Sequence, residues 1–199
     1  MVEKTILVER EGPIKIITFN RPEVANALND QLSMEFYDAI CECATDDTVR
    51  AVLLTGKGKM FCGGGDLKFL LSKKKEVKEM LLKMTNYLHG AIARMAKMNA
   101  PVVIAVNGSA GGGGLSLAIS GDIVISAESA KYTLAYTKAG LSPDASSTFY
   151  LPRLVGLRRA KELMLTSRIF TAQEAYDMGM VNKVVPHDEL EQEAYDWAQ

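Results

Sequence analysis

Two glycine-rich segments, Phe61–Asp66 and Asn107–Gly114, constrain this chain more than any other feature of its sequence. Each follows a short apolar run, Val49–Thr55 or Pro101–Val106, whose length and β-branched side chains are typical of a buried strand. Glycine permits positive φ and lets the backbone approach a ligand closely. A helix that begins at such a segment also presents free N–H groups at the positive end of its dipole. Two segments of this kind that converge would form an oxyanion hole.

Two other roles compete with the oxyanion hole. A glycine-rich segment can bind phosphate, but no Lys-Ser or Lys-Thr pair follows Gly111–Gly114, and neither segment begins with the G-x-G-x-x-G pattern of dinucleotide-binding proteins. The glycines can also serve only to permit tight turns. Spacing alone leaves this structural role and the catalytic role about equally open.

Strands and helices are predicted to alternate along the chain, which favours an α/β fold. The apolar runs Thr5–Glu9 and Ile14–Phe19 are separated by Arg-Glu-Gly-Pro and predict a hairpin. A length of 199 residues with 48% hydrophobic content suits a single domain, 1–199. Helical spacing of apolar residues predicts helices over 30–43, 76–98, 115–120, 158–166, 171–178 and from 188 onward.

Composition excludes several classes of partner. The formal net charge is -1, which gives no argument for nucleic acid or an anionic membrane. The longest apolar run, Pro101–Val106, is too short to span a bilayer. Cys41, Cys43 and Cys62 are an odd number without metal-like pairing, so we expect free thiols in a reducing compartment, the cytoplasm. With two histidines in the chain, no metal site is expected.

Several motifs together resemble the crotonase (enoyl-CoA hydratase/isomerase) superfamily. Asn20–Glu23 with Asn26–Asn29 resembles the opening signature of that family. Phe61–Leu67 and Ala105–Gly114 resemble its two oxyanion segments. Further matches fall at 122–126, 151–156 and 172–181, so the likeness covers nearly the whole chain in the family's order.

The resemblance implies an α/β fold built as a spiral of ββα units. It also implies an acyl-coenzyme A substrate from fatty acid or aromatic acid metabolism. No separate cofactor is expected, since coenzyme A is part of the substrate. The resemblance further implies a homo-trimer or hexamer. The chain is expected to form one acyl-CoA-binding domain whose C-terminal helical part is shortened. The lid and oligomerisation helices of the family would then be largely absent.

The family's oxyanion donors correspond to the N–H groups of Gly63 and Gly113. Two such donors stabilise the negative charge that forms on a thioester oxygen when its α-proton leaves, and losing one typically costs about a hundredfold in rate. The resemblance places coenzyme A near the first segment, at Phe61, Cys62, Gly65 and Asp66. The turn Asp66-Leu67-Lys68-Phe69 equally suits Asp66 as a helix N-cap.

The two glutamates of true hydratases fall at Ser116 and Tyr136, and neither of these residues is a carboxylic acid. A hydratase is therefore disfavoured, because water addition lacks its base. Both residues are predicted to line the substrate pocket, although a packed tyrosine and a structural serine are the ordinary alternatives.

One acidic residue, Asp144, lies in the part of the chain where the resemblance places a catalytic carboxylate. Pro143-Asp144 resembles the segment of ring-1,2-epoxyphenylacetyl-CoA isomerases, which also move double bonds between β,γ and α,β positions and use this aspartate as a proton shuttle. The resemblance therefore implies that Asp144 catalyses a 1,3-proton shift, with an enolate held in the oxyanion hole. A turn or helix N-cap is the structural alternative for Asp144. Other family reactions, such as hydrolysis or decarboxylation, and a catalytically silent acyl-CoA-binding protein also remain open.

Overall fold

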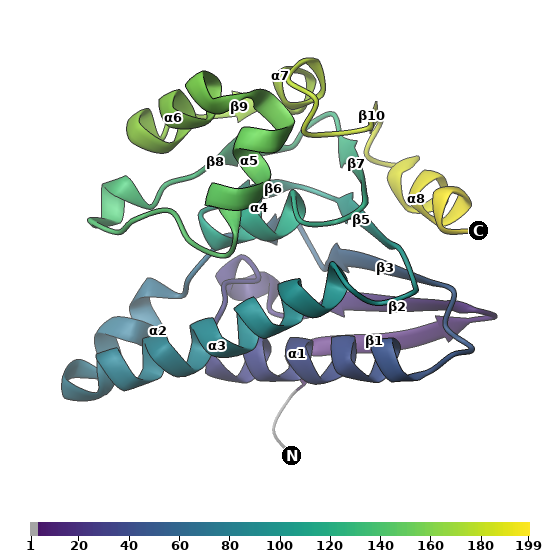
Figure 1. The fold of residues 1–199 in the computed structure, drawn as a ribbon, viewed down its shortest axis with the longest axis horizontal. Coiled ribbons are helices and arrows are strands. Elements are labelled where there is room, and N and C mark those ends of the chain that lie inside the picture. Colours follow the sequence, from purple (N-terminus) through teal and green to yellow (C-terminus); the bar gives the residue numbers. More distant parts are fainter. Residues whose placement is uncertain (1–3) are drawn as a thin grey trace.

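Two β-sheets form the framework of the protein (Figure 1). The structure is a computed structural model that describes residues 4–199. The larger sheet has the strand order β1-β2-β3-β5-β7-β10, and the smaller one has the order β4-β6-β8-β9. The strands of the larger sheet are β1 (Ile6–Glu11), β2 (Ile14–Phe19), β3 (Ala51–Gly56), β5 (Val102–Val106), β7 (Ile123–Ala127) and β10 (Lys183–Val185).

The predicted hairpin is confirmed, since β1 pairs antiparallel with β2. The other pairings of the larger sheet are parallel, as expected for strands joined by helical crossovers. Successive side chains of a strand point to opposite faces of the sheet. Both faces of the larger sheet are covered by buried side chains. Val52 and Leu54 belong to the main core, whereas Leu53 belongs to a second core on the other face.

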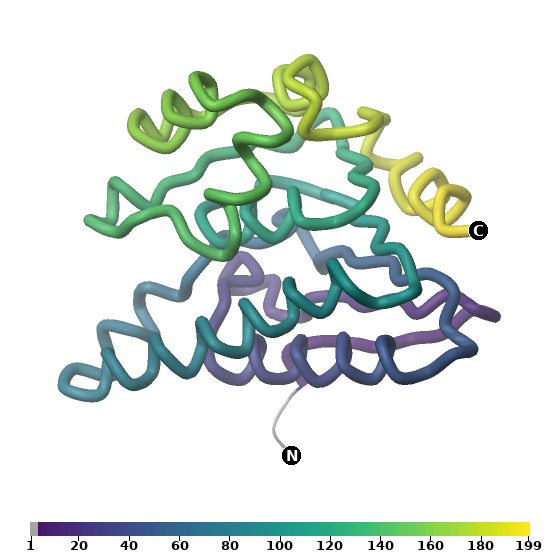
Figure 2. The backbone as a smooth tube through the Cα atoms, in the orientation of Figure 1, coloured from purple at the N-terminus to yellow at the C-terminus, as the bar shows by residue number. Residues whose placement is uncertain are grey.

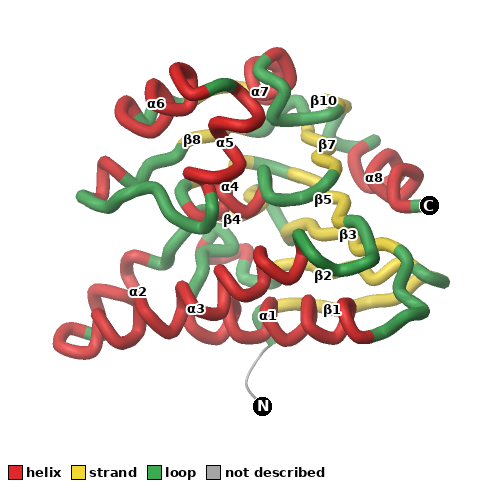
Figure 3. Tube along the Cα trace, in the orientation of Figure 1, coloured by secondary structure: helices red, strands yellow, loops and turns green. Residues whose placement is uncertain are grey.

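Helices α1 (Asp30–Thr45) and α3 (Val77–Met95) pack side by side over the main core, as Figure 3 shows. Helix α8 (Leu190–Ala198) covers the opposite face, where Leu190 and Ala194 contact the second core. Helix α1 begins as predicted, because the Asn29 side chain accepts a hydrogen bond from the N–H of Leu32.

The smaller sheet as a whole was not expected from the sequence, which suggests only a short strand at Tyr132–Leu134, overlapping β8. Its strands are β4 (Met60–Cys62), β6 (Ser109–Gly111), β8 (Lys131–Thr133) and β9 (Phe170–Thr171), all short. Three successive turns of the chain, β3–β4, β5–β6 and β7–β8, each supply one strand to the larger sheet, one to the smaller sheet and then a helix. This confirms the α/β class and gives the spiral that the backbone trace follows in Figure 2.

The remaining helices are shorter and lie mostly around the smaller sheet. They are α2 (Leu67–Ser72), α4 (Gly113–Ala118), α5 (Ser147–Val155), α6 (Leu157–Thr166) and α7 (Ala172–Asp177), with single 3-10 turns η1 (Pro22–Val24), η2 (Lys74–Glu76) and η3 (Thr137–Ala139). Helix α5 was missed, since Pro152 lies inside it. Within residues 4–199, no helix combines the length and apolar character needed to cross a membrane.

Candidate active site

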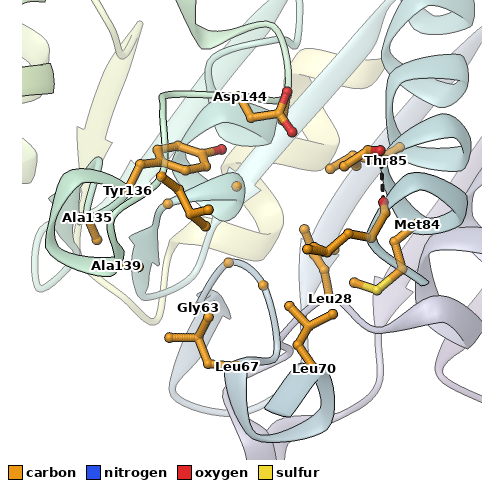
Figure 4. Close-up of a pocket in the computed structure, with 18 of the residues that line it drawn as sticks. Leu28, Gly63, Leu67, Leu70, Met84, Thr85, Ala135, Tyr136, Ala139 and Asp144 are labelled. Atoms are coloured by element: carbon orange, nitrogen blue, oxygen red, sulfur yellow. Dashed lines mark hydrogen bonds between the residues drawn. The ribbon is translucent and has the colours of Figure 1, made fainter. Parts of the chain in front are cut away.

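A cavity of about 160 Å³ opens between α3, the two glycine segments and the loop 135–145. Its walls are largely apolar, and Figure 4 shows Leu28, Leu70 and Met84 across the cavity from Tyr136 and Asp144. Apolar walls with a few convergent polar groups are typical of small-molecule sites. The lining includes Gly63, Gly64, Gly65, Gly112, Gly113, Tyr136 and Asp144.

A short ladder to the loop 25–28 fixes the first glycine segment. The N–H of Gly63 donates to Ala25 O at 2.8 Å, and the N–H of Leu28 donates to Gly64 O at 2.7 Å. The N–H of Asp66 in turn donates to Leu28 O at 2.9 Å. Because Gly64 and Asp66 both face Leu28, the N–H of Gly65 between them points the opposite way, and it has no hydrogen-bond partner within residues 4–199.

The prediction that Gly63 supplies the first oxyanion donor is therefore wrong. Its N–H is already used in the ladder to Ala25, so it is not available to a ligand. The available donor of this segment is Gly65, two residues further along, which also lines the cavity. The sequence gives no signal for this difference, because the ladder depends on residues about forty positions earlier in the chain.

The second segment presents Gly113 as the first residue of α4, at the positive end of the helix. Its N–H has no hydrogen-bond partner in the described part of the chain. The two segments touch, since a Cβ added to Gly64 would lie 2.7 Å from Gly111 O and 3.2 Å from Gly113 N. Only glycine at position 64 allows this approach, and its φ of +92° also favours glycine.

The residues predicted to bind coenzyme A behave differently from one another. Phe61 and Cys62 have no exposed surface, so only their backbone could reach a ligand. Burial raises the pKa of the Cys62 thiol to about 12, which keeps it neutral and inert. Asp66 caps α2 by accepting from the N–H of Phe69, and its other oxygen lies 3.1 Å from Arg21. Both carboxylate oxygens of Asp66 are thus occupied within the protein.

Of the two predicted pocket residues, Tyr136 lines the cavity and Ser116 does not. Ser116 is fully buried on α4, and its hydroxyl lies 3.0 Å from the hydroxyl of Tyr136. Burial is the main cause that raises the pKa of Tyr136 to about 12, so the phenol stays protonated at neutral pH. Ser116 thus contacts the cavity wall from behind, through Tyr136 and through Gly112 O, to which its hydroxyl donates.

Asp144 lies at the mouth of the cavity, where its side chain is 43% exposed. Its carboxylate Oδ1 is 2.8 Å from His89 Nε2, a residue of α3 to which the sequence assigned no role. His89 follows Leu81 and Thr85 at intervals of four residues, so it shares the helix face that lines the cavity. That spacing is the signal that could have identified it.

The backbone around Asp144 adopts an unusual conformation. Ala145 and Ser146 both have positive φ, at 51° and 61°, which costs energy for residues with a side chain. The Asp144 carbonyl accepts from the N–H and the hydroxyl of Ser147, so the backbone forms the expected turn while the carboxylate remains directed at His89. Strained backbone of this kind is common beside functional groups.

No group of three or more His, Cys, Asp or Glu side chains within residues 4–199 could hold a metal ion. The fold and the cavity thus define an α/β protein with an apolar ligand pocket, two unpaired backbone donors and one carboxylate–imidazole pair.

Comparison with known proteins then identifies the family. The pattern of the enoyl-CoA hydratase/isomerase family matches residues 9–199, and the chain belongs to this family. It is 38% identical over 186 residues to 1,2-epoxyphenylacetyl-CoA isomerase of Escherichia coli (strain K12), covering 93% of this chain and 71% of that protein. It is also 38% identical to 4-chlorobenzoyl coenzyme A dehalogenase-1 of an Arthrobacter species, covering 90% of this chain and 65% of that one.

Solved structures agree with the sequence relatives. The crystal structure of an enoyl-CoA hydratase from Bacillus anthracis superimposes with a TM-score of 0.91 at 36% identity, covering 98% of this chain and 75% of that chain. One from a Polaromonas species gives 0.90 at 33% identity, with 97% of this chain and 75% of that chain covered. The chain thus spans between 65% and 75% of the length of these relatives. The predicted crotonase membership is confirmed.

Proposed function

We propose that this protein is an acyl-CoA isomerase that shifts a double bond through a thioester enolate. The N–H groups of Gly65 and Gly113 bind the thioester oxygen, and the Asp144 carboxylate carries the proton. One observation carries the proposal: the two unpaired donors and Asp144 line the same cavity. The name of the Escherichia coli relative supports an isomerase on a coenzyme A thioester.

The reaction requires one base and one place for negative charge. The Asp144 carboxylate takes a proton from the α-carbon of a β,γ-unsaturated acyl-CoA, and the electron pair of the C–H bond moves onto the thioester oxygen. The two backbone donors stabilise that oxygen because they are fixed before the charge forms. The protonated Asp144 then returns a proton to the γ-carbon, and the double bond ends in the α,β position. No water is added to the substrate, and no second carboxylate takes part.

The cavity suits the acyl part of such a substrate. Its volume of about 160 Å³ is smaller than most pockets that enclose a whole ligand of this kind. Its apolar walls from α2 and α3 fit a hydrocarbon chain or ring, while the nucleotide end would remain outside. The absence of carboxylates at Ser116 and Tyr136 supports isomerisation over hydration.

The direct test is conversion of a β,γ-unsaturated acyl-CoA, measured by absorbance of the conjugated thioester. We expect wild type to convert it and Asp144→Asn to lose at least about a hundredfold in kcat. Lys138→Gln, a nearby exposed change on η3, serves as the control. Full activity of Asp144→Asn would refute the proton-shuttle role, and acyl-CoA binding without turnover on any substrate would favour a silent binding protein.

A second candidate function is removal of a halogen from a ring-bearing acyl-CoA, since the Arthrobacter relative is named a 4-chlorobenzoyl coenzyme A dehalogenase. The 2.8 Å contact between His89 and Asp144 favours it. The carboxylate would attack the ring carbon and expel halide, forming an ester. His89 would then take a proton from water as that water attacks the ester carbonyl, which restores Asp144.

The variant His89→Gln separates the two candidates. Hydrolysis requires the imidazole as base, so this variant would stop at the ester. The intact protein would then gain the mass of the 4-halobenzoyl-CoA less its halide, because the thioester remains intact. Isomerisation requires only Asp144, so the variant would retain most of the double-bond shift. Absence of halide release from wild type would eliminate the second candidate. Assembly as a trimer or hexamer, and the single-domain organisation over 1–199, stay predictions.

A further inference from the structure

Three polar contacts connect the second glycine segment to the loop that carries Asp144. The hydroxyl of Ser116 donates to Gly112 O at 3.2 Å. The same hydroxyl lies 3.0 Å from the hydroxyl of Tyr136. The Tyr136 carbonyl in turn accepts from the N–H of Leu141 at 3.0 Å, within the loop that carries Asp144. The connection therefore runs from the helix that presents Gly113 to the loop that carries the catalytic carboxylate proposed above.

The direction of these hydrogen bonds follows from the number of protons available. A serine hydroxyl has one proton, and Ser116 uses it on Gly112 O. The Ser116 oxygen can then accept from the hydroxyl of Tyr136, 3.0 Å away. The tyrosine proton is retained at neutral pH because burial raises the pKa of Tyr136 to about 12.

We propose that Ser116 and Tyr136 are positioning residues that hold Asp144 in register with the oxyanion donor Gly113. This inference rests on the proposed isomerase function. Ser116 lies three residues after Gly113 on α4, so the helix that presents the donor also anchors the tyrosine. A Cβ on Gly113 would lie 3.6 Å from the Tyr136 hydroxyl, which shows how close the ring is to the donor.

The backbone explains why such a connection is required. Ala135, before Tyr136, and Ala145, after Asp144, both have positive φ, at 42° and 51°. Residues with a side chain adopt this region at a cost, and they remain there only when their surroundings hold them. At one end, the loop 135–145 is joined to the body of the protein by the Tyr136 hydroxyl and by Thr137, whose hydroxyl lies 2.6 Å from that of Ser167. At the other end, the Asp144 carboxylate contacts His89. The Tyr136 hydroxyl is the contact that ties this loop to α4, the helix of Gly113.

The expected effect is on the rate of the chemical step. Misplacing a reacting group by about 1 Å can reduce a rate by about a hundredfold. We expect Ser116→Ala and Tyr136→Phe each to lower kcat by about tenfold or more. Ser116→Ala should change KM by less than about twofold, because Ser116 does not line the cavity. The double variant should lose no more than the larger single effect, because both changes break the same connection.

The chain offers a matched control in Ser126 and Tyr132. Their hydroxyls lie 2.6 Å apart and both side chains are buried, but neither residue lines the cavity. Ser126→Ala and Tyr132→Phe remove the same atoms elsewhere in the core. We expect them to lower the unfolding midpoint at least as much as the site variants do, and to leave kcat unchanged.

The experiment compares all variants on one β,γ-unsaturated acyl-CoA and follows the Asp144 amide by NMR. The inference predicts lower kcat and a shifted Asp144 amide resonance for Ser116→Ala and Tyr136→Phe, and neither change for the control pair. Wild-type kcat in both site variants, beside an inactive Asp144→Asn, would overturn the positioning role while leaving the isomerase intact. An active Asp144→Asn would instead overturn the proposed function itself.

Discussion

Replacing Gly64 by alanine would place a methyl group between the two glycine segments. The added Cβ would lie 2.7 Å from Gly111 O and 3.2 Å from Gly113 N, whereas ordinary contacts begin at 3.4 Å. The obstructing atoms belong to the backbone, so no side chain can rotate away. The segments that carry the donors Gly65 and Gly113 must therefore separate by several tenths of an ångström.

The size of the effect follows from this displacement. A shift of about 1 Å in a reacting geometry costs on the order of a hundredfold, so we expect kcat to fall by roughly 10- to 100-fold. The positive φ of Gly64 adds a stability loss of about 1–2 kcal/mol for any residue with a Cβ. Steady-state kinetics on a β,γ-unsaturated acyl-CoA and urea unfolding measure the two effects separately.

Gly12→Ala provides the control for backbone strain. Gly12 also has positive φ, at +56°, but a Cβ there would meet nothing within 4 Å. This variant should lose stability by a comparable amount of about 1–2 kcal/mol and keep its full activity. If Gly64→Ala were equally active, the two segments would not form the oxyanion hole, and the reasoning from their contact would be refuted.

Three further predictions concern other parts of the structure. Gly65→Pro removes the proposed donor and should lower kcat/KM by about a hundredfold or more. Gly65→Ala keeps the N–H, and its Cβ would approach only Leu70, at 4.0 Å, so this variant should stay active. Equal activities of the two variants would exclude Gly65 as the donor. Asp66→Ala should lower the free energy of unfolding by about 1 kcal/mol, because α2 loses its N-cap. Asp66→Asn keeps an oxygen that can accept the cap hydrogen bond, so it should lose less stability. Equal losses of the two variants in urea unfolding would contradict the capping role. Burial raises the pKa of Cys43 to about 11 and that of Cys62 to about 12, from 9.0 for a free thiol. Both thiols therefore stay neutral in the folded protein while they ionise in the unfolded chain, so stability should fall as pH rises above about 9, and a flat profile would contradict it.

Local signals predicted the long elements well. Helix α1 has both an apolar stripe and an N-cap at Asn29, and α7 has a capping box between Thr171 and Glu174. Such elements are specified within a few residues of their ends. Helix α5 was missed because Pro152 lies inside it and because it follows two residues of positive φ, Ala145 and Ser146, which no propensity predicts for these residue types.

The site was predicted in part, because it is assembled from distant segments. The glycine patterns located the two segments, but which N–H remains unpaired depends on the ladder to Ala25 and Leu28. His89 gave no motif, and only its place on α3 brings it to Asp144. Ser116 and Tyr136 stand twenty positions apart, and the fold alone joins their hydroxyls. Composition and periodicity cannot predict pairings over such separations.

The central claim is that Asp144 moves a proton while the backbone donors hold an enolate. The most direct measurement is NMR of a β,γ-unsaturated acyl-CoA incubated with the protein in D2O. The account predicts that wild type forms the α,β-unsaturated isomer with deuterium at the γ-carbon, because the proton held by Asp144, whose side chain is 43% exposed, exchanges with D2O before a proton is returned. Asp144→Asn should form neither the isomer nor the deuterated product. Isomer formation by Asp144→Asn at the wild-type rate would contradict the account.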